Sequence, residues 1–315
     1  MKSLLALLIL LVFSVVPLFS QVQLITVNSQ RNQDNSVSIF TESQAYGDYT
    51  VKLIFTTLNG YSANHSLNGN VGLVTVGRGK QEVIRLTPQR SGGINSYQYR
   101  YEYFPGRALT KTPDSSFLYL LPSKPGHDVR ISKVSSLEER LGQKRSDDFY
   151  STGFVYKLGD TICASRGGVI YASSQEVKEG EKLTQFYKSE RNKISIQHKD
   201  GSISDYSILA PIQLIVSAGD NVLPGQPLAV FNKESEKYTV LLATFYLDEK
   251  KVLRENNENN GNRPSYITYI PTYFYFGEND KPSHLELNKL YTAQTSNSIV
   301  TAEMSNRDKK KFKLK

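Results

Sequence analysis

The chain has 315 residues and a single cysteine, Cys163, so it cannot contain an internal disulfide and its domains must be stable through their hydrophobic cores. Its 38 Lys and Arg against 30 Asp and Glu give a formal net charge of +8. This charge suits work near an anionic cell wall or membrane surface, and a generic basic surface explains it equally well. We expect no nucleic-acid partner, because the chain begins with an export signal.

Residues 1–20 have the pattern of a secretory signal peptide. Lys2 supplies a positive charge, and residues 4–19 are almost wholly apolar. Pro17 breaks any helix in this run, and the small residue Ser20 follows it. The alternative is a membrane anchor, but a spanning helix needs about 20 apolar residues. We therefore expect cleavage near the end of this run, no later membrane span, and a secreted or periplasmic protein of the cell envelope.

Residues 21–115 are predicted to form an immunoglobulin-like β-sandwich. Between positions 97 and 103, four tyrosines alternate with polar residues, which is typical of a strand with one aromatic and one polar face. Turn signals such as Asn59-Gly60 and Asn68-Gly69 separate the apolar runs. The aromatic face is expected to pack in the core, and a platform for carbohydrate is the alternative.

Three segments are predicted outside the sandwich and outside the second domain, which covers residues 149–250. Residues 116–148 form a linker that opens with an apolar strand ending at Pro122 and includes, from Ser135 onward, the one place where a short helix is expected. After the second domain, residues 251–304 form a C-terminal β extension. Residues 305–315 hold five lysines and are predicted to be a basic, disordered tail.

Residues 149–250 contain four phrases in a definite order. They are Gly159–Ile170, Asn192–Leu209, Val216–Ala229 and Leu242–Leu247. This order resembles that of the LytM/lysostaphin-like zinc metallopeptidases, which cut peptide cross-bridges in peptidoglycan, and a trailing Ile-Pro phrase at Ile270 resembles members from Bacteroidetes-type bacteria. The resemblance implies an all-β protein in which the β-sandwich precedes a duplicated-hybrid-motif barrel or sandwich. Biotinyl and lipoyl domains share the third phrase.

The family's chemistry depends on a zinc ion held by a His, an Asp and the second His of a His-Leu-His phrase. Carried onto this sequence, the Asp falls on Gly153 and the His-Leu-His phrase on Leu242 to Thr244. The supporting His of the family falls on Ile208. Because these side chains cannot bind zinc usefully, we expect a catalytically degenerate domain with no zinc and no other cofactor.

Four polar residues are candidates to line the groove that the resemblance implies: His198, Asp200, Tyr206 and Arg166. His198 matches a phrase of the family in which it is structural or groove-lining rather than a metal ligand, and Asp200-Gly201 predicts a hairpin turn. Cys163 paired with His198 as nucleophile and base is an alternative, but its place in a core strand favours a buried thiol.

These observations leave three hypotheses. The first is a non-catalytic envelope protein that binds peptidoglycan or regulates a cell-wall hydrolase, as degenerate members of the resembled family do. The second is an active zinc endopeptidase with non-standard ligands. The third is a structural envelope adaptor. The sequence does not determine the oligomeric state.

Overall fold

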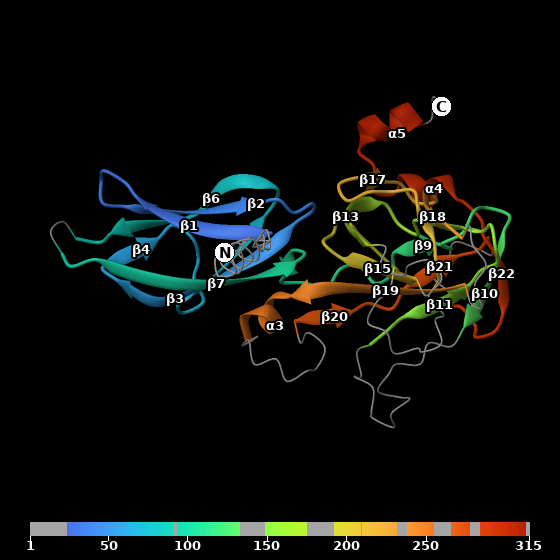
Figure 1. Ribbon diagram of the computed structural model, residues 1–315, viewed down its shortest axis with the longest axis horizontal. Helices are drawn as coiled ribbons and strands as arrows, with labels where there is room; N and C mark the ends of the chain where they lie inside the picture. The colour runs from blue at the N-terminus through green and yellow to red at the C-terminus, as the bar shows by residue number, and fades with distance from the viewer. Residues whose placement is uncertain are drawn as a thin grey trace, which may run out of the picture.

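The computed structural model describes residues 24–90, 93–132, 149–174, 192–208, 210–231, 238–254, 266–277 and 284–312. In this part the protein is all-β, as the sequence predicted, and its strands lie mostly in antiparallel sheets with a few short helices beside them (Figure 1). The predicted signal peptide and the helix expected from Ser135 onward lie outside the described residues. None of the described helices has the length and apolar character needed to cross a membrane.

The first domain consists of two sheets that share one core. Its strands are β1 (Ile25–Arg31), β2 (Val37–Ser43), β3 (Tyr49–Asn59), β4 (Tyr61–Ala63), β5 (Val71–Val76), β6 (Gly79–Pro88) and β7 (Ser96–Pro105). One sheet has the order β1-β2-β6-β4 and the other β5-β3-β7. Alternate residues such as Leu53 and Ile84 are fully buried between them. The four tyrosines of β7 pack against this core and are partly buried, which confirms the expectation of core packing.

The second domain is organised around a long twisted sheet. Its strands are β8 (Ala108–Leu109), β9 (Leu118–Leu120), β10 (Asp128–Ser132), β11 (Thr152–Val155), β12 (Thr161–Cys163), β13 (Gly168–Ser174), β14 (Asn192–Gln197), β15 (Ile203–Ile208), β16 (Gln213–Leu214), β17 (Asn221–Val222), β18 (Pro227–Val230), β19 (Thr239–Asp248), β20 (Ile267–Tyr269), β21 (Tyr273–Tyr275) and β22 (Leu290–Thr292). The long sheet has the order β17-β13-β14-β15-β19-β11-β10-β22, and β20 and β8 also pair with β19. Two small sheets, β12-β18-β16 and β9-β21, complete the domain.

The structure corrects the predicted linker. Strand β9 pairs in parallel with β21, and β10 pairs with β11 and β22, so residues 118–132 belong to the sheets of the second domain. The physical reason is the apolar content of this stretch, because Tyr119 and Leu121 enter the main core of that domain. The predicted C-terminal β extension is also corrected in part, since it includes most of helix α3 (Glu249–Arg254) and all of helix α4 (Asn297–Thr301).

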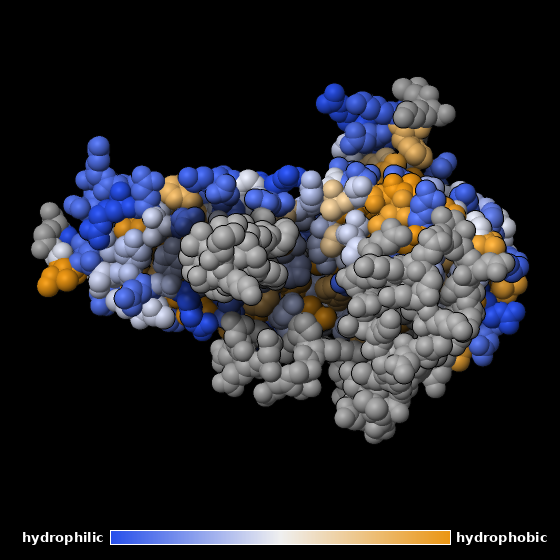
Figure 2. Space-filling model, in the orientation of Figure 1, coloured by the Kyte–Doolittle hydropathy of each residue, from blue (hydrophilic) through white to orange (hydrophobic). Residues whose placement is uncertain are grey.

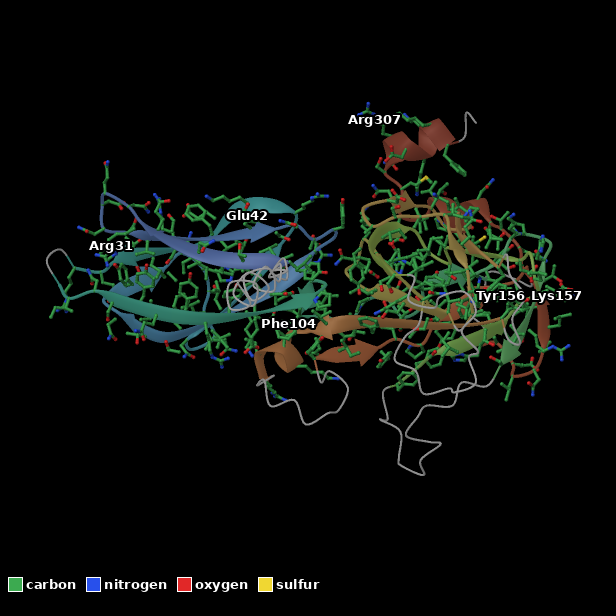
Figure 3. All side chains as sticks on the ribbon, viewed as in Figure 1. Arg31, Glu42, Phe104, Tyr156, Lys157 and Arg307 are labelled. Carbon is green, nitrogen blue, oxygen red and sulfur yellow. The ribbon has the colours of Figure 1, made fainter. Side chains whose placement is uncertain are left out.

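The two domains are joined by a small core of their own. Phe104 at the end of β7 packs with Phe245 and Leu247 of β19 and with Val252 of α3 (Figure 3). Beside it, the buried Lys52 of β3 donates hydrogen bonds to the carbonyl oxygens of Val252, at 2.9 Å, and of the next residue, at 3.3 Å. These carbonyls end α3, where a helix leaves its acceptors unpaired, so the lysine ties the helix to the first domain.

Helix α5 (Asn306–Phe312) corrects the predicted disordered tail. Ser305 caps it, because the hydroxyl of Ser305 accepts a hydrogen bond from the backbone N–H of Asp308 and donates one to its carboxylate. Lysines in the last turn also suit the negative end of the helix dipole. The helix buries none of its residues and stands off the domain as a hydrophilic projection that carries Arg307 (Figures 2 and 3).

Candidate functional site

The four residues predicted to line a groove meet around one loop, residues 164–167, between β12 and β13. The backbone N–H of Ser165 donates to the hydroxyl of Tyr206 at 2.8 Å. The next residue, Arg166, forms an ion pair with Asp200 at 2.9 Å. Gly167 then accepts a hydrogen bond through its carbonyl from Nδ1 of His198 at 2.8 Å. Three consecutive residues are thus each held by side chains that the sequence singled out.

Local sequence explains why these partners converge. The predicted hairpin at Asp200-Gly201 joins β14 to β15, and Gly201 has the positive φ of 90° that such a turn demands. The carboxylate of Asp200 accepts hydrogen bonds from both the backbone and the hydroxyl of Ser202, which fixes its orientation. After the loop, a Cβ at Gly168 would meet the carbonyl oxygen of Gln197 at 2.2 Å, so only glycine lets β13 approach β14 here.

Arg166 is the centre of the site. We call the arginine and the five side chains around it the Arg166 centre: Phe117, Tyr119, Asp200, Ser202 and Glu303. The guanidinium is buried, with its side chain 3% exposed, and lies over the ring of Phe117 at 3.9 Å from the centroid.

All five N–H groups of the guanidinium are used. Nε and Nη2 bind the two carboxylate oxygens of Glu303 at 2.9 and 2.6 Å. Nη2 also donates to Asp200 at 2.9 Å. Nη1 donates to the hydroxyls of Tyr119 at 3.0 Å and Ser202 at 3.3 Å.

The charges of the Arg166 centre stabilise one another. Burial opposes the charge of Arg166, but the hydrogen bond to Glu303 and the nearby negative groups outweigh it, so the pKa of the arginine lies above its usual value. Burial alone would raise the pKa of Asp200. The positive charge of Arg166 and the hydrogen bonds from Ser202 more than offset it, so the pKa of Asp200 lies below its usual value. Both groups are therefore ionised at neutral pH.

Both ring nitrogens of His198 are hydrogen-bonded, and they link the ring into a chain of buried hydrogen bonds. A carbonyl can only accept, so Nδ1 carries the proton that Gly167 receives, and Nε2 accepts from Ser204 at 2.7 Å. Ser204 is in turn hydrogen-bonded to Thr244 at 3.1 Å, and Thr272 donates to Thr244 at 3.3 Å. Burial, followed by the charge of Arg166, lowers the pKa of His198 to about 3, so the ring is neutral at neutral pH.

The positions predicted to have lost zinc ligands lie on three neighbouring strands. Ile208 of β15 is buried in the main core with Leu242 of β19. The hydroxyl of Thr244 is hydrogen-bonded to Ser204, the partner of His198. In the antiparallel register, Leu242 lies opposite Tyr206 and Thr244 opposite Ser204, so these side chains share one face.

Gly153 is the exception among these positions. It lies opposite Leu241 rather than Leu242, so a side chain at 153 would project from the other face of the sheet. Counting residues along the family phrase therefore assigned the Asp ligand to a position on the opposite face of the sheet, one residue away from Thr152, which lies opposite Leu242. A glycine, a leucine and an isoleucine offer no donor atom and the threonine hydroxyl is occupied, so these residues do not fit a zinc ion.

Other metal-binding or nucleophilic groups are scattered. His65 contacts a backbone carbonyl in the first domain, His127 faces Asp160, and His284 lies against the ring of Tyr273. Within the described residues, no three His, Cys, Asp or Glu side chains converge as metal ligands would. Cys163 is fully buried in β12, and burial raises the pKa of its thiol to about 11, as expected for a core thiol rather than a nucleophile.

Sequence reasoning missed four members of the Arg166 centre, which are Phe117, Tyr119, Ser202 and Glu303. The ring of Tyr119 lies between Arg166 and His198, 5.9 Å edge-on from the imidazole, yet its phrase predicted only a core strand. Glu303 lies 137 residues beyond Arg166 in a segment with no motif, and no local signal connects the two. Periodicity identifies buried faces, but it does not identify such distant partners.

A scan against protein-family models found no match, and a search of curated proteins found none with significant similarity. The fold defines the class as all-β, with a polar centre built around a buried arginine.

Proposed function

We propose that this chain is a non-catalytic protein of the bacterial cell envelope that acts by binding, with peptidoglycan or a cell-wall hydrolase as its partner. The export pattern at the N-terminus and the order of the LytM-like phrases support the compartment and the class of partner. The protein would share the recognition of wall peptides with the resembled family, but it would not hydrolyse them.

The saturated Arg166 centre carries the non-catalytic part of this proposal. Hydrolysis of an amide needs a base or a metal-bound water that can reach the substrate. His198 is 3% exposed, and both of its ring nitrogens are engaged inside the protein. Arg166 and Asp200 form an ion pair, and the positions where the resembled family has its zinc ligands carry no usable donor here. These residues therefore support the fold rather than a reaction.

A structural adaptor is the second candidate, and the domain junction favours it. Lys52, with only 2% of its surface exposed, ties the end of α3 to the first domain. The backbone N–H of Asp48 donates to the side chain of Gln197 at 2.7 Å, beside an edge contact between Tyr49 and Tyr171. Contacts of this kind hold two domains in one orientation, which suits a spacer between envelope components.

Co-sedimentation of residues 21–315 with insoluble peptidoglycan tests the proposal. We expect the protein to pellet with the wall material, to release no soluble peptides, and to contain far less than one equivalent of zinc. A variant that ends at residue 304 is the matched control, because it lacks the basic α5 segment and therefore most of the excess positive charge that would attract anionic wall polymers non-specifically. Binding by this variant at about 0.5 M salt, where exposed charges are screened, would identify a specific site.

Two outcomes would contradict the proposal. Zinc-dependent release of peptides would establish the endopeptidase alternative. Failure to bind peptidoglycan, together with failure to retain a cell-wall hydrolase on the immobilised protein, would leave the adaptor as the better account.

A further inference from the structure

The Arg166 centre has the geometry of a carboxylate receptor. Nε and Nη2 present two roughly parallel N–H groups to the two oxygens of Glu303, which is the bidentate arrangement that arginine uses to recognise carboxylates. The ligand in this structure belongs to the chain itself. Its side chain remains 23% exposed, so Glu303 is only partly buried.

The receptor is held in place without Glu303. The guanidinium stacks on Phe117, and its remaining N–H groups bind Tyr119, Ser202 and Asp200. All four partners precede the C-terminal segment, and Asp200 is itself oriented by Ser202. Removing Glu303 therefore leaves the Nε–Nη2 edge pointing in the same direction with two unsatisfied donors, which favours any group that can accept both hydrogen bonds.

The segment that carries Glu303 is held by few contacts. Ile299 and Val300 of α4 are buried in a small cluster with Leu120, separate from the main core of the domain. Beyond them, Met304 and Phe312, the last residue of α5, are only partly buried against this cluster, and no residue of α5 is fully buried. A segment with so little buried apolar surface can leave the domain at a much lower cost than a core strand.

The surrounding charges select the ligand. Asp200 already contributes one negative charge at Nη2, so a dianionic phosphate would be repelled more strongly than a monoanionic carboxylate. Lys199 adds a second cation beside Glu303, because its Nζ donates to the backbone carbonyl of Glu303 at 3.4 Å. A free peptide end offers a carboxylate and, one residue earlier, an amide carbonyl, and it can therefore use both cations.

We propose that the Arg166 centre is a binding site for the terminal carboxylate of a peptide, and that Glu303 occupies it as an internal ligand that an incoming peptide displaces. This inference rests on the proposed function, because it names the part of a wall peptide that the protein would recognise and the contact that regulates access. The C-terminal segment then acts as a tethered competitor for the site.

The variant Glu303→Ala tests this directly, with sodium acetate and an acetylated Ala-Ala dipeptide as probes. In the variant, the vacated N–H groups should bind either carboxylate and raise the Tm by about 2–4 °C at a ligand concentration about five times the Kd. The dipeptide with an amidated C-terminus, and sodium chloride at equal ionic strength, should produce no such rise. The wild-type protein should respond at least tenfold more weakly, because Glu303 competes within the same molecule.

Three further variants keep the test falsifiable. Asp308→Ala removes another acid of the same segment and should leave the protein unresponsive to acetate. Arg166→Lys in the Glu303→Ala background keeps the charge but loses the fork, and should abolish the response. Glu303→Gln keeps most of the local packing, so its intermediate response would separate loss of the ligand from loss of folding.

The results separate this inference from the proposed function. No carboxylate response in a folded Glu303→Ala protein would make the ion pair purely structural and overturn the inference, even if the wild type still pelleted with peptidoglycan. A carboxylate response without any peptidoglycan binding would support the receptor and remove the proposed wall ligand. Dimer formation by wild type, with Glu303 seated in a second copy, would also overturn the inference, and size-exclusion chromatography detects it.

Discussion

The substitution Arg166→Met measures how strongly the Arg166 centre stabilises the fold. Methionine fills much of the same volume but donates no hydrogen bond, so the carboxylates of Asp200 and Glu303 would face each other without a cation. Removing one partner of a fully buried ion pair costs about 3–5 kcal/mol. The two carboxylates here are 26% and 23% exposed, so water recovers part of that loss, and we expect about 3 kcal/mol.

Urea denaturation followed by circular dichroism provides the measurement. With a slope near 3 kcal/mol per molar urea, the expected loss lowers the midpoint by about 1 M. The same substitution at Arg85 is the matched control, because its pair with Glu82 has a distance of 3.5 Å and both side chains are well exposed. Such a pair contributes at most about 1 kcal/mol. Equal losses in the two variants would refute the assignment of a stabilising role to the Arg166 centre.

The pH dependence of the same variant gives a second check. In the wild type, the folded pKa of Asp200 lies below the unfolded value of 3.8, so its contribution is present above that pH and is lost as the pH falls through the folded pKa. In Arg166→Met this contribution is absent, and two neighbouring carboxylates repel. The difference in unfolding free energy between the two proteins should therefore narrow below about pH 4, where protonation relieves that repulsion.

Three other substitutions or reagents test separate parts of the structure. Burial holds the pKa of His198 near 3 in the folded protein, against 6.5 in the unfolded chain. The neutral ring therefore contributes stability above pH 6.5, and this contribution is lost as the pH falls from 6.5 toward 3. In urea titrations, His198→Asn should make the unfolding free energy depend less on pH over this range. Cys163, buried and with its thiol pKa raised to about 11, should react with a disulfide reagent at least a hundredfold faster after denaturation than before it. Lys52→Met should remove the donor to the end of α3, cost about 1–3 kcal/mol and speed proteolytic cleavage between the domains.

Local patterns predicted the elements of this fold better than their partners. The alternation of tyrosines from 97 to 103 correctly indicated a strand with one core face, because side chains in a strand alternate between its two sides. The apolar run that ends at Pro122 correctly indicated a strand as well. Its domain was misassigned, since pairing of β9 with β21 joins segments more than 150 residues apart and leaves no trace in local composition.

The candidate site shows the same limit at the level of single residues. His198, Asp200 and Tyr206 were singled out because they lie in the second phrase of the resemblance, and that phrase folds as the hairpin of β14 and β15. The role of Arg166 depends on Phe117, Asp200 and Glu303, which come from three distant parts of the chain. The sequence could not indicate that the arginine is buried, because that follows only when all three partners are in place.

The contacts of Arg166 also explain how this part of the domain is held in one arrangement. A metal ion holds a site together by drawing several anionic or polar ligands to one cation. Here a guanidinium gathers two carboxylates and two hydroxyls, with ligands from the loop after β14, from β9 and from the segment after α4. Unlike a metal, the arginine cannot be lost, but one of its ligands can. Because Asp200, Ser202 and Tyr119 still hold the guanidinium when Glu303 is replaced, hydrogen exchange should rise in the segment from α4 onward and stay unchanged in the hairpin at Asp200.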